Sequence, residues 1–257
     1  MMKHAIILLL FLLPLLATAQ TDGDYLVFET VVLTPNPAHI TEFEAGLAAH
    51  NKKYHGEGTY AARTFLIANG PRSSSYAWVM GPFPWKSLDD RPAQAGGHDA
   101  DWNKNVHRYL MDGGMGTYLK LNADVSHFPN DFMMKNLLVD FYDVKRFKSQ
   151  DALELMKPIQ KVMMEKFPDD TYGIYTNEFP NTTDGMDLAY ISFFEKSAWL
   201  GEDPDFAMKY NEVHGEGSFE KFLKDWEAAT QGAQSELWRF LPDLSGISGE
   251  ILAADRQ

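Results

Sequence analysis

Two acidic residues at matching positions in the two halves of the chain could act as general bases. Glu29 lies in the strand-like segment 25–32 (YLVFETVV), and Asp140 lies in the segment 136–144 (NLLVDFYDV). Successive strand side chains point to opposite faces, and we assign the purely apolar positions to the face that packs on helices. Both acids would then point into the space on the other face, where burial would raise their pKa and suit them to proton abstraction. Glu29 and Asp140 are therefore the predicted catalytic residues.

The same alternation predicts a ligand-binding surface on the neighbouring strands. The candidate side chains are aromatic or polar: Arg63, Tyr76, Trp78, Tyr142, Tyr175, Asn177 and Tyr190. An aromatic-walled space with a few convergent polar groups is typical of a small-molecule site, and a tyrosine there could stabilise an oxyanion. The alternative is that Glu29 and Arg63 form a buried structural ion pair.

The histidines form no recognisable metal-binding motif. No HExxH sequence occurs and no two histidines are four residues apart, so zinc-protease geometry is absent and no metal site is predicted. His50 lies along an apolar helical stripe and is expected to be a half-buried, hydrogen-bonded core residue. His98 precedes Asp99 and Asp101 at an expected helix start, where capping is favoured over metal binding. His107 lies one position beyond the stripe residue Val106. It could ligate a haem, but this is the minority interpretation.

The tetrapeptide His-Gly-Glu-Gly occurs twice, at residues 55–58 and 214–217. The two copies fall at different places in the two halves, and both fall where the chain must turn. We expect turns there, with a ligand contact from the loop as the alternative.

Composition excludes several classes of function. The 257 residues include 23 Lys and Arg against 36 Asp and Glu, a net charge of −13, and no cysteine. A disulfide framework, a thiolate metal site, a cysteine nucleophile and a basic nucleic-acid surface are therefore excluded. Phosphate-loop, dinucleotide and nucleophile-elbow motifs are absent, and no cofactor is predicted.

The first residues have the pattern of an export signal. Lys3 precedes an apolar run from Ala5 to Leu16, and Ala17-Thr18-Ala19 supplies the small residues of a cleavage site. We expect residues 1–19 to be a signal peptide and the protein to be periplasmic or secreted. The run is shorter than the roughly 20 residues of a spanning helix, so no membrane association is expected after cleavage.

The rest of the chain contains one order of elements twice. In the first half, strands are expected at 25–32, 60–68, 75–80 and 117–121, with helices at 38–54 and 99–111. In the second half, strands are expected at 136–144, 172–179, 188–194 and 236–241, with helices at 150–167 and 218–230. The order β-α-β-β-α-β in each half is the ferredoxin-like unit. We expect units at 20–130 and 131–244, long loops at 82–97 and 197–217 that could act as lids, and a flexible tail at 245–257.

Such a unit has both helices on one face of its sheet, and the other face must be buried. With two units in tandem, the chain resembles the dimeric α/β-barrel superfamily, which includes monooxygenases, isomerases and stress-responsive barrel proteins. The resemblance implies an α+β fold in which the two units pack sheet to sheet as an intramolecular barrel. The resemblance rests on the order of elements from Tyr25 to about Pro242. It assigns none of the superfamily's catalytic residues to a position in this chain. Pairing within one chain predicts a monomer or a weak homodimer.

Three classes of function follow from these observations. The favoured interpretation is an exported protein that binds a small hydrophobic or aromatic molecule in an aromatic, acid-containing barrel interior. The alternatives are a cofactor-independent monooxygenase or isomerase of the barrel type and a structural or interaction module. No nucleic-acid partner is expected, because the chain is acidic.

Overall fold

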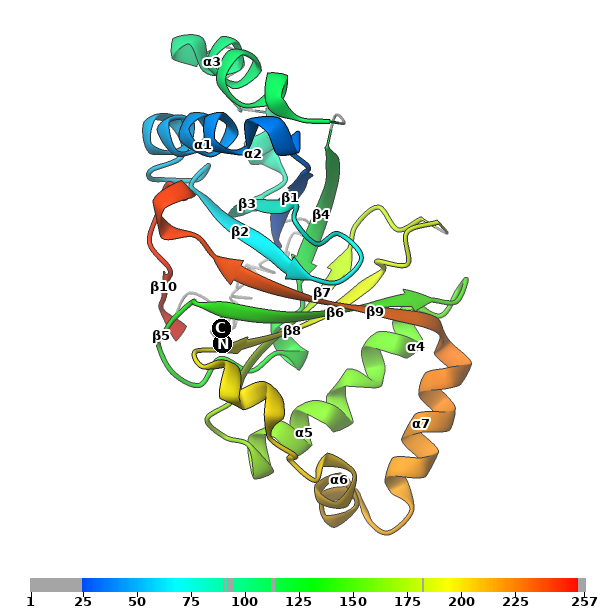
Figure 1. The fold of residues 1–257 in the computed structure, drawn as a ribbon. Helices are drawn as coiled ribbons and strands as arrows, with labels where there is room; N and C mark the ends of the chain where they lie inside the picture. The colour runs from blue at the N-terminus through cyan, green and yellow to red at the C-terminus, as the bar shows by residue number, and fades with distance from the viewer. Residues whose placement is uncertain (1–24, 90, 92–94, 112–113, 182, 254–257) are drawn as a thin grey trace, which may run out of the picture.

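Eight strands from both halves of the chain form one closed antiparallel barrel. The computed structural model describes residues 25–89, 91, 95–111, 114–181 and 183–253. The strand order around the barrel is β1-β3-β2-β9-β6-β8-β7-β4. Helices of the first half pack on one side of the barrel and helices of the second half on the opposite side (Figure 1). The predicted α+β fold with an intramolecular barrel is confirmed.

Each half is a ferredoxin-like unit with strand order 4-1-3-2. The first unit contains β1 (Leu26–Leu33), β2 (Ala62–Asn69), β3 (Tyr76–Pro84), β4 (Met115–Leu121), α1 (Ile40–Tyr54), α2 (Lys86–Asp89) and α3 (His98–Asn105). The second contains β6 (Asn136–Val144), β7 (Thr171–Asn177), β8 (Leu188–Phe194), β9 (Thr230–Phe240), α4 (Ser149–Glu154), α5 (Met156–Lys166), α6 (Phe206–His214) and α7 (Ser218–Ala229). Short 3-10 helices lie at Pro37–His39, Ala95–Gly97, His107–Tyr109, Ala123–Val125, Ser197–Gly201 and Pro242–Leu244.

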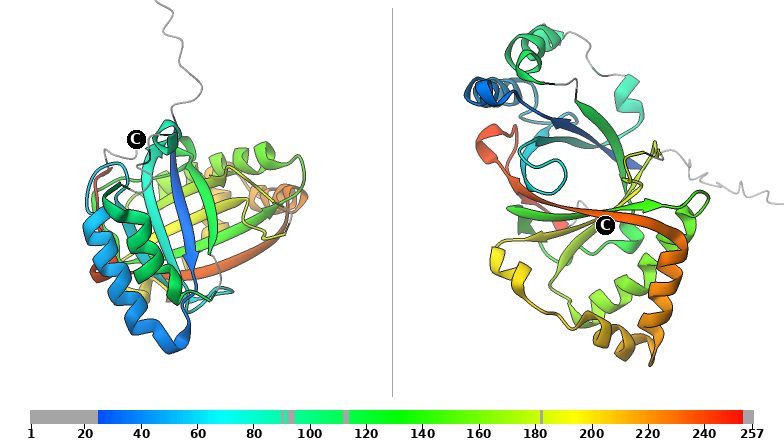
Figure 2. Two further views of the ribbon diagram at one scale, coloured as in Figure 1. Left: turned by 90° about the horizontal axis from the view of Figure 1, so that it is seen from above. Right: turned by 45° about the vertical axis from the view of Figure 1, so that its right-hand side comes forward.

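The two units are joined along their edges as well as by their faces. β2 pairs with β9, and β4 pairs with β7, both antiparallel. These pairings use the outer strands that an isolated unit would expose, and closure of this kind leaves no free edge in the barrel. Two views from other directions show the strands enclosing a common centre (Figure 2).

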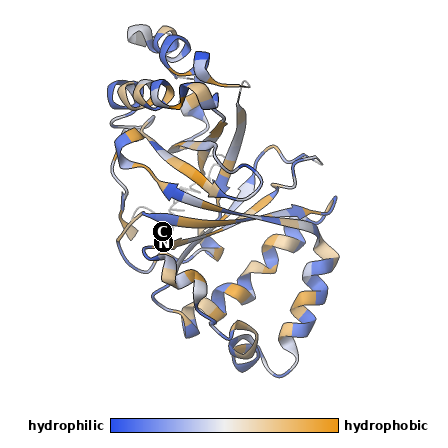
Figure 3. Ribbon diagram, in the orientation of Figure 1, coloured by the Kyte–Doolittle hydropathy of each residue, from blue (hydrophilic) through white to orange (hydrophobic). Residues whose placement is uncertain are grey.

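Apolar side chains from all eight strands fill the centre of the barrel. They are Phe28, Phe65, Val79, Leu119, Leu137, Tyr175, Ile191 and Trp238, one from each strand. The orange, hydrophobic stretches of the strands meet there, whereas the outer helices alternate orange and blue along their length (Figure 3). The barrel interior is therefore the main hydrophobic core.

Two expectations about irregular segments are wrong. The segment 197–217 is largely helical, because it contains a 3-10 turn and α6, whose Tyr210 is buried against the second unit. The tail expected to be flexible is ordered through Ala253: β10 (Glu250–Ile251) pairs with β5 (Phe132–Met133), and Ile251 is 3% exposed. The remaining residues, 254–257, lie outside the described part of the chain.

The expected signal peptide, residues 1–19, also lies outside the described residues. Among the described helices, none has the length and apolar character that crossing a bilayer requires.

Candidate functional site

The barrel interior holds only three of the nine side chains predicted to form a site. Arg63 and Tyr175 line the interior, and Asn177 follows Tyr175 on the same face and donates to the Met186 carbonyl. The space between them is small, about 70 Å³, because apolar side chains fill it. Arg63 lies at one end of the barrel and donates to the carbonyls of Ser248 and Glu250 in the ordered tail. The interior is thus a packed core with little room for a ligand.

The other six predicted side chains lie on the outer faces of the two sheets. Those of the first unit are Glu29, Tyr76 and Trp78, and those of the second are Asp140, Tyr142 and Tyr190. The predicted inward orientation is wrong for all six, because strands enclose the barrel interior on every side and the most apolar positions therefore face it. Whether these six residues bind or catalyse stays a prediction.

In the second unit, the outer face is filled by aromatic side chains. Tyr172 and Tyr190 stack with ring centroids 4.7 Å apart, and Tyr142 lies edge-on to Trp226 of α7. Burial raises the pKa of Asp140, which bonds Ser235 of β9, and burial also raises the pKa of Tyr142 and Tyr190. This half of the molecule is built as a second hydrophobic layer.

In the first unit, the outer face carries a pocket of about 720 Å³ between the sheet and the helices. Its walls come from β1, β3, α1, α3 and the segment between β3 and α3. The apolar and aromatic lining residues are Val31, Leu33, Tyr54, Tyr60, Trp78, Met80, Leu88, Trp102 and Leu110; the polar ones are Glu29, His55, Arg91, His98, Asp99, Asn103 and His107. The volume lies within the range of small-molecule sites.

Three of the aromatic wall residues, Trp78, Tyr60 and Tyr54, have their polar atoms bound within the protein. The Trp78 indole N–H donates to Asn51, the Tyr60 hydroxyl donates to the Ser87 carbonyl, and the Tyr54 hydroxyl donates to the Gly96 carbonyl. The rings themselves are therefore what these residues offer to the pocket. Glu29 forms an ion pair with Arg91, so the alternative in which Glu29 pairs with Arg63 is not what the structure contains.

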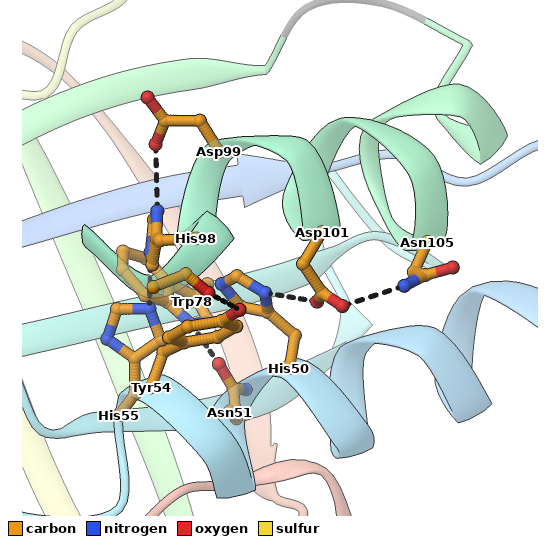
Figure 4. A network of polar contacts seen from close by, with 10 residues as sticks. His50, Asn51, Tyr54, His55, Trp78, His98, Asp99, Asp101 and Asn105 are labelled. Carbon is orange, nitrogen blue, oxygen red and sulfur yellow. Dashed lines mark hydrogen bonds and ion pairs between the residues drawn. The ribbon is translucent and has the colours of Figure 1, made fainter. Parts of the chain in front are cut away.

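Three histidines converge at the end of the pocket where α1 and α3 meet (Figure 4). His50 is on α1, His55 caps the end of α1, and His98 begins α3. One nitrogen of each lies within 4.8 Å of one nitrogen of each of the others. Their rings pack closely, with the His50 centroid 4.7 Å from that of His98 and 5.2 Å from that of His55.

Each of these histidines has its Nδ1 beside an oxygen that accepts a hydrogen bond. His50 Nδ1 is 2.8 Å from Asp101, His98 Nδ1 is 2.8 Å from Asp99, and His55 Nδ1 is 2.7 Å from the Tyr60 carbonyl. Carbonyls and carboxylates only accept, so in each neutral ring Nδ1 carries the proton and Nε2 carries a lone pair. The Nε2 atoms of His55 and His98 are 3.2 Å apart, and buried His50 Nε2 has no hydrogen-bond partner.

Burial keeps two of the three rings uncharged near neutral pH. It lowers the pKa of His55 to about 4 and also lowers the pKa of His50, although the hydrogen bond to Asp101 opposes the second shift. Asp101 also accepts from the Asn105 amide, and its pKa is lowered by the His50 hydrogen bond.

The local sequence explains why these groups meet. Gly46 allows the two helices to touch, since a Cβ at this position would lie 1.8 Å from the Asn105 carbonyl oxygen. The end of α1 then turns His55 back toward β3, where its ring lies edge-on to Trp78. Asp99 and Asp101, expected to cap α3, accept from His98 and His50 instead, and no side chain caps the helix start.

Sequence reasoning treated these histidines separately and missed the cluster. His50 was expected to be half-buried and hydrogen-bonded, but it is fully buried with one nitrogen unpaired. The first His-Gly-Glu-Gly copy supplies His55 to the cluster. His214 of the second copy instead contacts the Pro158 carbonyl, within the second unit. The signals available in the sequence were the five-residue spacing across a helix end and the acids beside His98. The helix contact at Gly46 was not visible.

Comparisons with known proteins identify the fold. No protein-family model matches the chain, and no curated protein sequence does. Solved structures resemble it over most of its length: a proposed monooxygenase from Lactobacillus acidophilus has 13% identity and a TM-score of 0.53, covering 89% of this chain and 99% of its own.

Two further structures give the same result. An anthrone oxidase-like protein has 12% identity and a TM-score of 0.51, covering 92% of this chain and 96% of its own. Chlorite dismutase from Candidatus Nitrospira defluvii, solved with imidazole, has 10% identity and a TM-score of 0.52, covering 86% of this chain and 92% of its own. At these identities the likeness establishes the fold alone: the chain has the dimeric α/β-barrel fold, with both units in one polypeptide.

Proposed function

We propose that the protein binds a small aromatic molecule in the pocket between the first sheet and helices α1 and α3. The observation that supports this most strongly is the pocket itself. Its volume is about 720 Å³, and aromatic rings wall it, of which Trp78, Tyr60 and Tyr54 have their polar atoms bound within the protein. A flat apolar ligand would be held by these rings and by the aliphatic residues of β1 and β3. The histidines at one end and the Glu29–Arg91 pair are among the polar groups that could orient the ligand.

This proposal moves the expected site from the interior of the barrel to its outer face. Binding in the two cavities can be compared with matched variants, because one valine on β1 faces the outer pocket and one valine on the neighbouring strand β3 faces the barrel interior. Val31 of β1 lines the outer pocket, and Val79 of β3 lines the barrel interior. A phenylalanine at either position would fill the space that the valine faces.

The test is calorimetric titration of the protein with 2-naphthol as the aromatic probe. Val31→Phe should weaken binding by about tenfold or more, whereas the matched variant Val79→Phe should bind as the parent does. Circular dichroism of both variants checks that they fold. No binding of 2-naphthol by the parent, or a loss confined to Val79→Phe, would contradict the proposal.

A monooxygenase or isomerase is the second candidate, and the fold of the proposed monooxygenase and the anthrone oxidase-like protein supports it at the level of architecture. Glu29 and Asp140 lie in different units, so a mechanism that uses both acids is not supported. Of these two acids, only Glu29 lines the pocket. Oxygen uptake with anthrone as substrate, compared between the parent and Glu29→Gln, tests this candidate.

We also propose that residues 1–19 direct export to the periplasm or the medium. We further propose that the mature protein is a monomer or weak homodimer. It would have no nucleic-acid or membrane partners. N-terminal sequencing of the protein purified from its producer should begin at Gln20, and light scattering should give the monomer mass. An uncleaved N-terminus would contradict export.

A further inference from the structure

We propose that His50, His55 and His98 bind one divalent transition-metal ion through their Nε2 atoms at the inner end of the pocket. Zinc is the ion that we expect, because three neutral imidazoles suit a four-coordinate zinc site with one open position. This proposal does not depend on the binding of an aromatic ligand.

The direction of the ring nitrogens favours a cation between the rings. All three Nδ1 atoms face acceptors, so in their neutral forms the three rings turn their Nε2 lone pairs toward one another. The 3.2 Å contact between Nε2 of His55 and Nε2 of His98 then requires a cation between these atoms, which is either a proton on one ring or a metal ion. Figure 4 shows the second nitrogen of His50 directed toward the same place.

The unpaired nitrogen of His50 also favours a metal ion at this place. Its ring is fully buried, and Nε2 has no partner among the described residues, although buried polar atoms are nearly always paired. A metal ion would satisfy this atom and the lone pairs of His55 and His98 together. Zinc–nitrogen bonds of about 2.0–2.1 Å place tetrahedral ligands about 3.3 Å apart. The His55–His98 separation of 3.2 Å already agrees, and the ligand atoms of all three histidines lie within 4.8 Å of one another, so an inward movement of His50 would complete the set.

The hydrogen bonds that hold the three rings from behind also fit a metal site. Histidines that ligate metals usually donate their other N–H to a carboxylate or backbone carbonyl, which fixes the ring and increases its basicity. Asp101, Asp99 and the Tyr60 carbonyl do this for the three rings. Asn105 in turn holds Asp101. These hydrogen bonds match those found around the histidine ligands of metal sites in proteins.

The place of the site also indicates what the fourth position would face. His55 and His98 line the 720 Å³ pocket, whereas His50 lies behind them. The side of the ion away from His50 would therefore open toward the pocket, where water or an oxygen atom of a bound molecule could reach it.

The experiment is zinc titration of the untagged protein after dialysis against EDTA, followed by calorimetry and elemental analysis. We expect one zinc ion per chain and a higher melting temperature with zinc. His98→Ala should weaken binding by about 100-fold or more, and Asp101→Asn by about 10- to 100-fold. The control His39→Ala removes an exposed histidine just before α1, the helix that carries His50, and should leave binding unchanged.

Cobalt provides a second readout that is independent of folding energetics. Because the chain has no cysteine, a visible cobalt spectrum would come from nitrogen and oxygen ligands. We expect the intense absorption of four-coordinate cobalt in the parent and in His39→Ala, and its loss in His98→Ala.

Three results would overturn the proposal: no stoichiometric zinc binding, equal zinc affinity in His98→Ala and His39→Ala, or magnetic resonance showing a proton shared between His55 and His98 when zinc is in excess. If His98→Ala fails to fold, the Asp101→Asn titration and the cobalt spectrum decide. Titration with 2-naphthol in EDTA separates the two proposals, because the pocket can bind the probe without metal.

Discussion

At the scale of single residues, the buried carboxylate of Glu236 is held by specific partners. Glu236 of β9 has a fully buried side chain, and both carboxylate oxygens are bound by Arg72, one of them also by the Trp238 indole N–H. Sequence alternation could not assign such partners, because Arg72 comes from a turn 164 positions away. The alternation correctly placed Arg63, Tyr175 and Asn177 toward the barrel interior. It misplaced Glu29 and Asp140, because we assigned the apolar face of their strands to the helices.

Removing Arg72 should be strongly destabilising. Arg72→Met leaves the Glu236 carboxylate buried without a counter-charge, which costs about 3–5 kcal/mol in comparable cases. Urea unfolding measures the loss. Restoration of most of that stability by the double variant Arg72→Met/Glu236→Gln would confirm the cause, whereas an equal loss in both would contradict it.

Asp140 should be a cost to stability at neutral pH. Burial raises its pKa in the folded state, so the folded protein favours the protonated form. Its contribution is complete below the unfolded pKa of about 3.9 and is lost as pH rises through the higher folded value. Asp140→Asn should therefore raise the melting temperature at pH 7, and the gain should shrink as the pH falls toward 4.

The exposed position Asp243 supplies the matched control, since Asp243→Asn should change little at either pH. A lower melting temperature for Asp140→Asn at pH 7 would contradict the argument. An equal gain at both pH values would do so as well.

At the scale of elements, the contact between α1 and α3 builds the pocket and brings the histidines together. The apolar spacing of Phe43 and Leu47 correctly predicted the first helix, and both residues are fully buried. The predicted second helix, 99–111, was too long: α3 ends at Asn105, and a 3-10 turn follows. Periodicity predicts that helices exist and which face is buried, but it does not give the distance between them.

Gly46→Ala should separate the two helices. The added methyl group would lie 1.8 Å from the Asn105 carbonyl oxygen, so α3 must move and carry His98 and Asp101 away from His50. We expect a lower melting temperature and zinc binding weakened by about tenfold or more. Gly201→Ala, where a Cβ meets nothing within 4 Å, is the control. Unchanged zinc affinity in Gly46→Ala would contradict this account of the site.

At the scale of the whole molecule, two units of one topology have different outer faces. The internal repeat and its fold class could be predicted from the order of elements, because each unit needs a partner for its bare sheet face. The difference between the halves could not be predicted, since it depends on how aromatic rings fill the second unit and leave a pocket in the first. The order of the C-terminal segment was also not predicted, because a two-residue strand such as β10 is too short to show an alternation of apolar and polar residues.

The C-terminal segment should contribute to barrel stability. Ile251 is 3% exposed and packs into the barrel core, and Arg63 holds the neighbouring backbone. Ile251→Ala should lower the free energy of unfolding by about 2 kcal/mol or more, measured by urea unfolding. A neutral effect would support the original expectation of a flexible tail, whereas Leu252→Ala, at an exposed neighbour, should be neutral.

The central claim is that the functional site lies outside the barrel, in the first unit. A crystal structure with 6-bromo-2-naphthol, using the anomalous signal of bromine, tests it most directly. We predict one strong bromine peak in the pocket of the first unit, beside the rings of Trp78 and Trp102 that line it. A peak inside the barrel beside Phe28 and Tyr175, or on the surface of the second unit with the pocket empty, would contradict the claim.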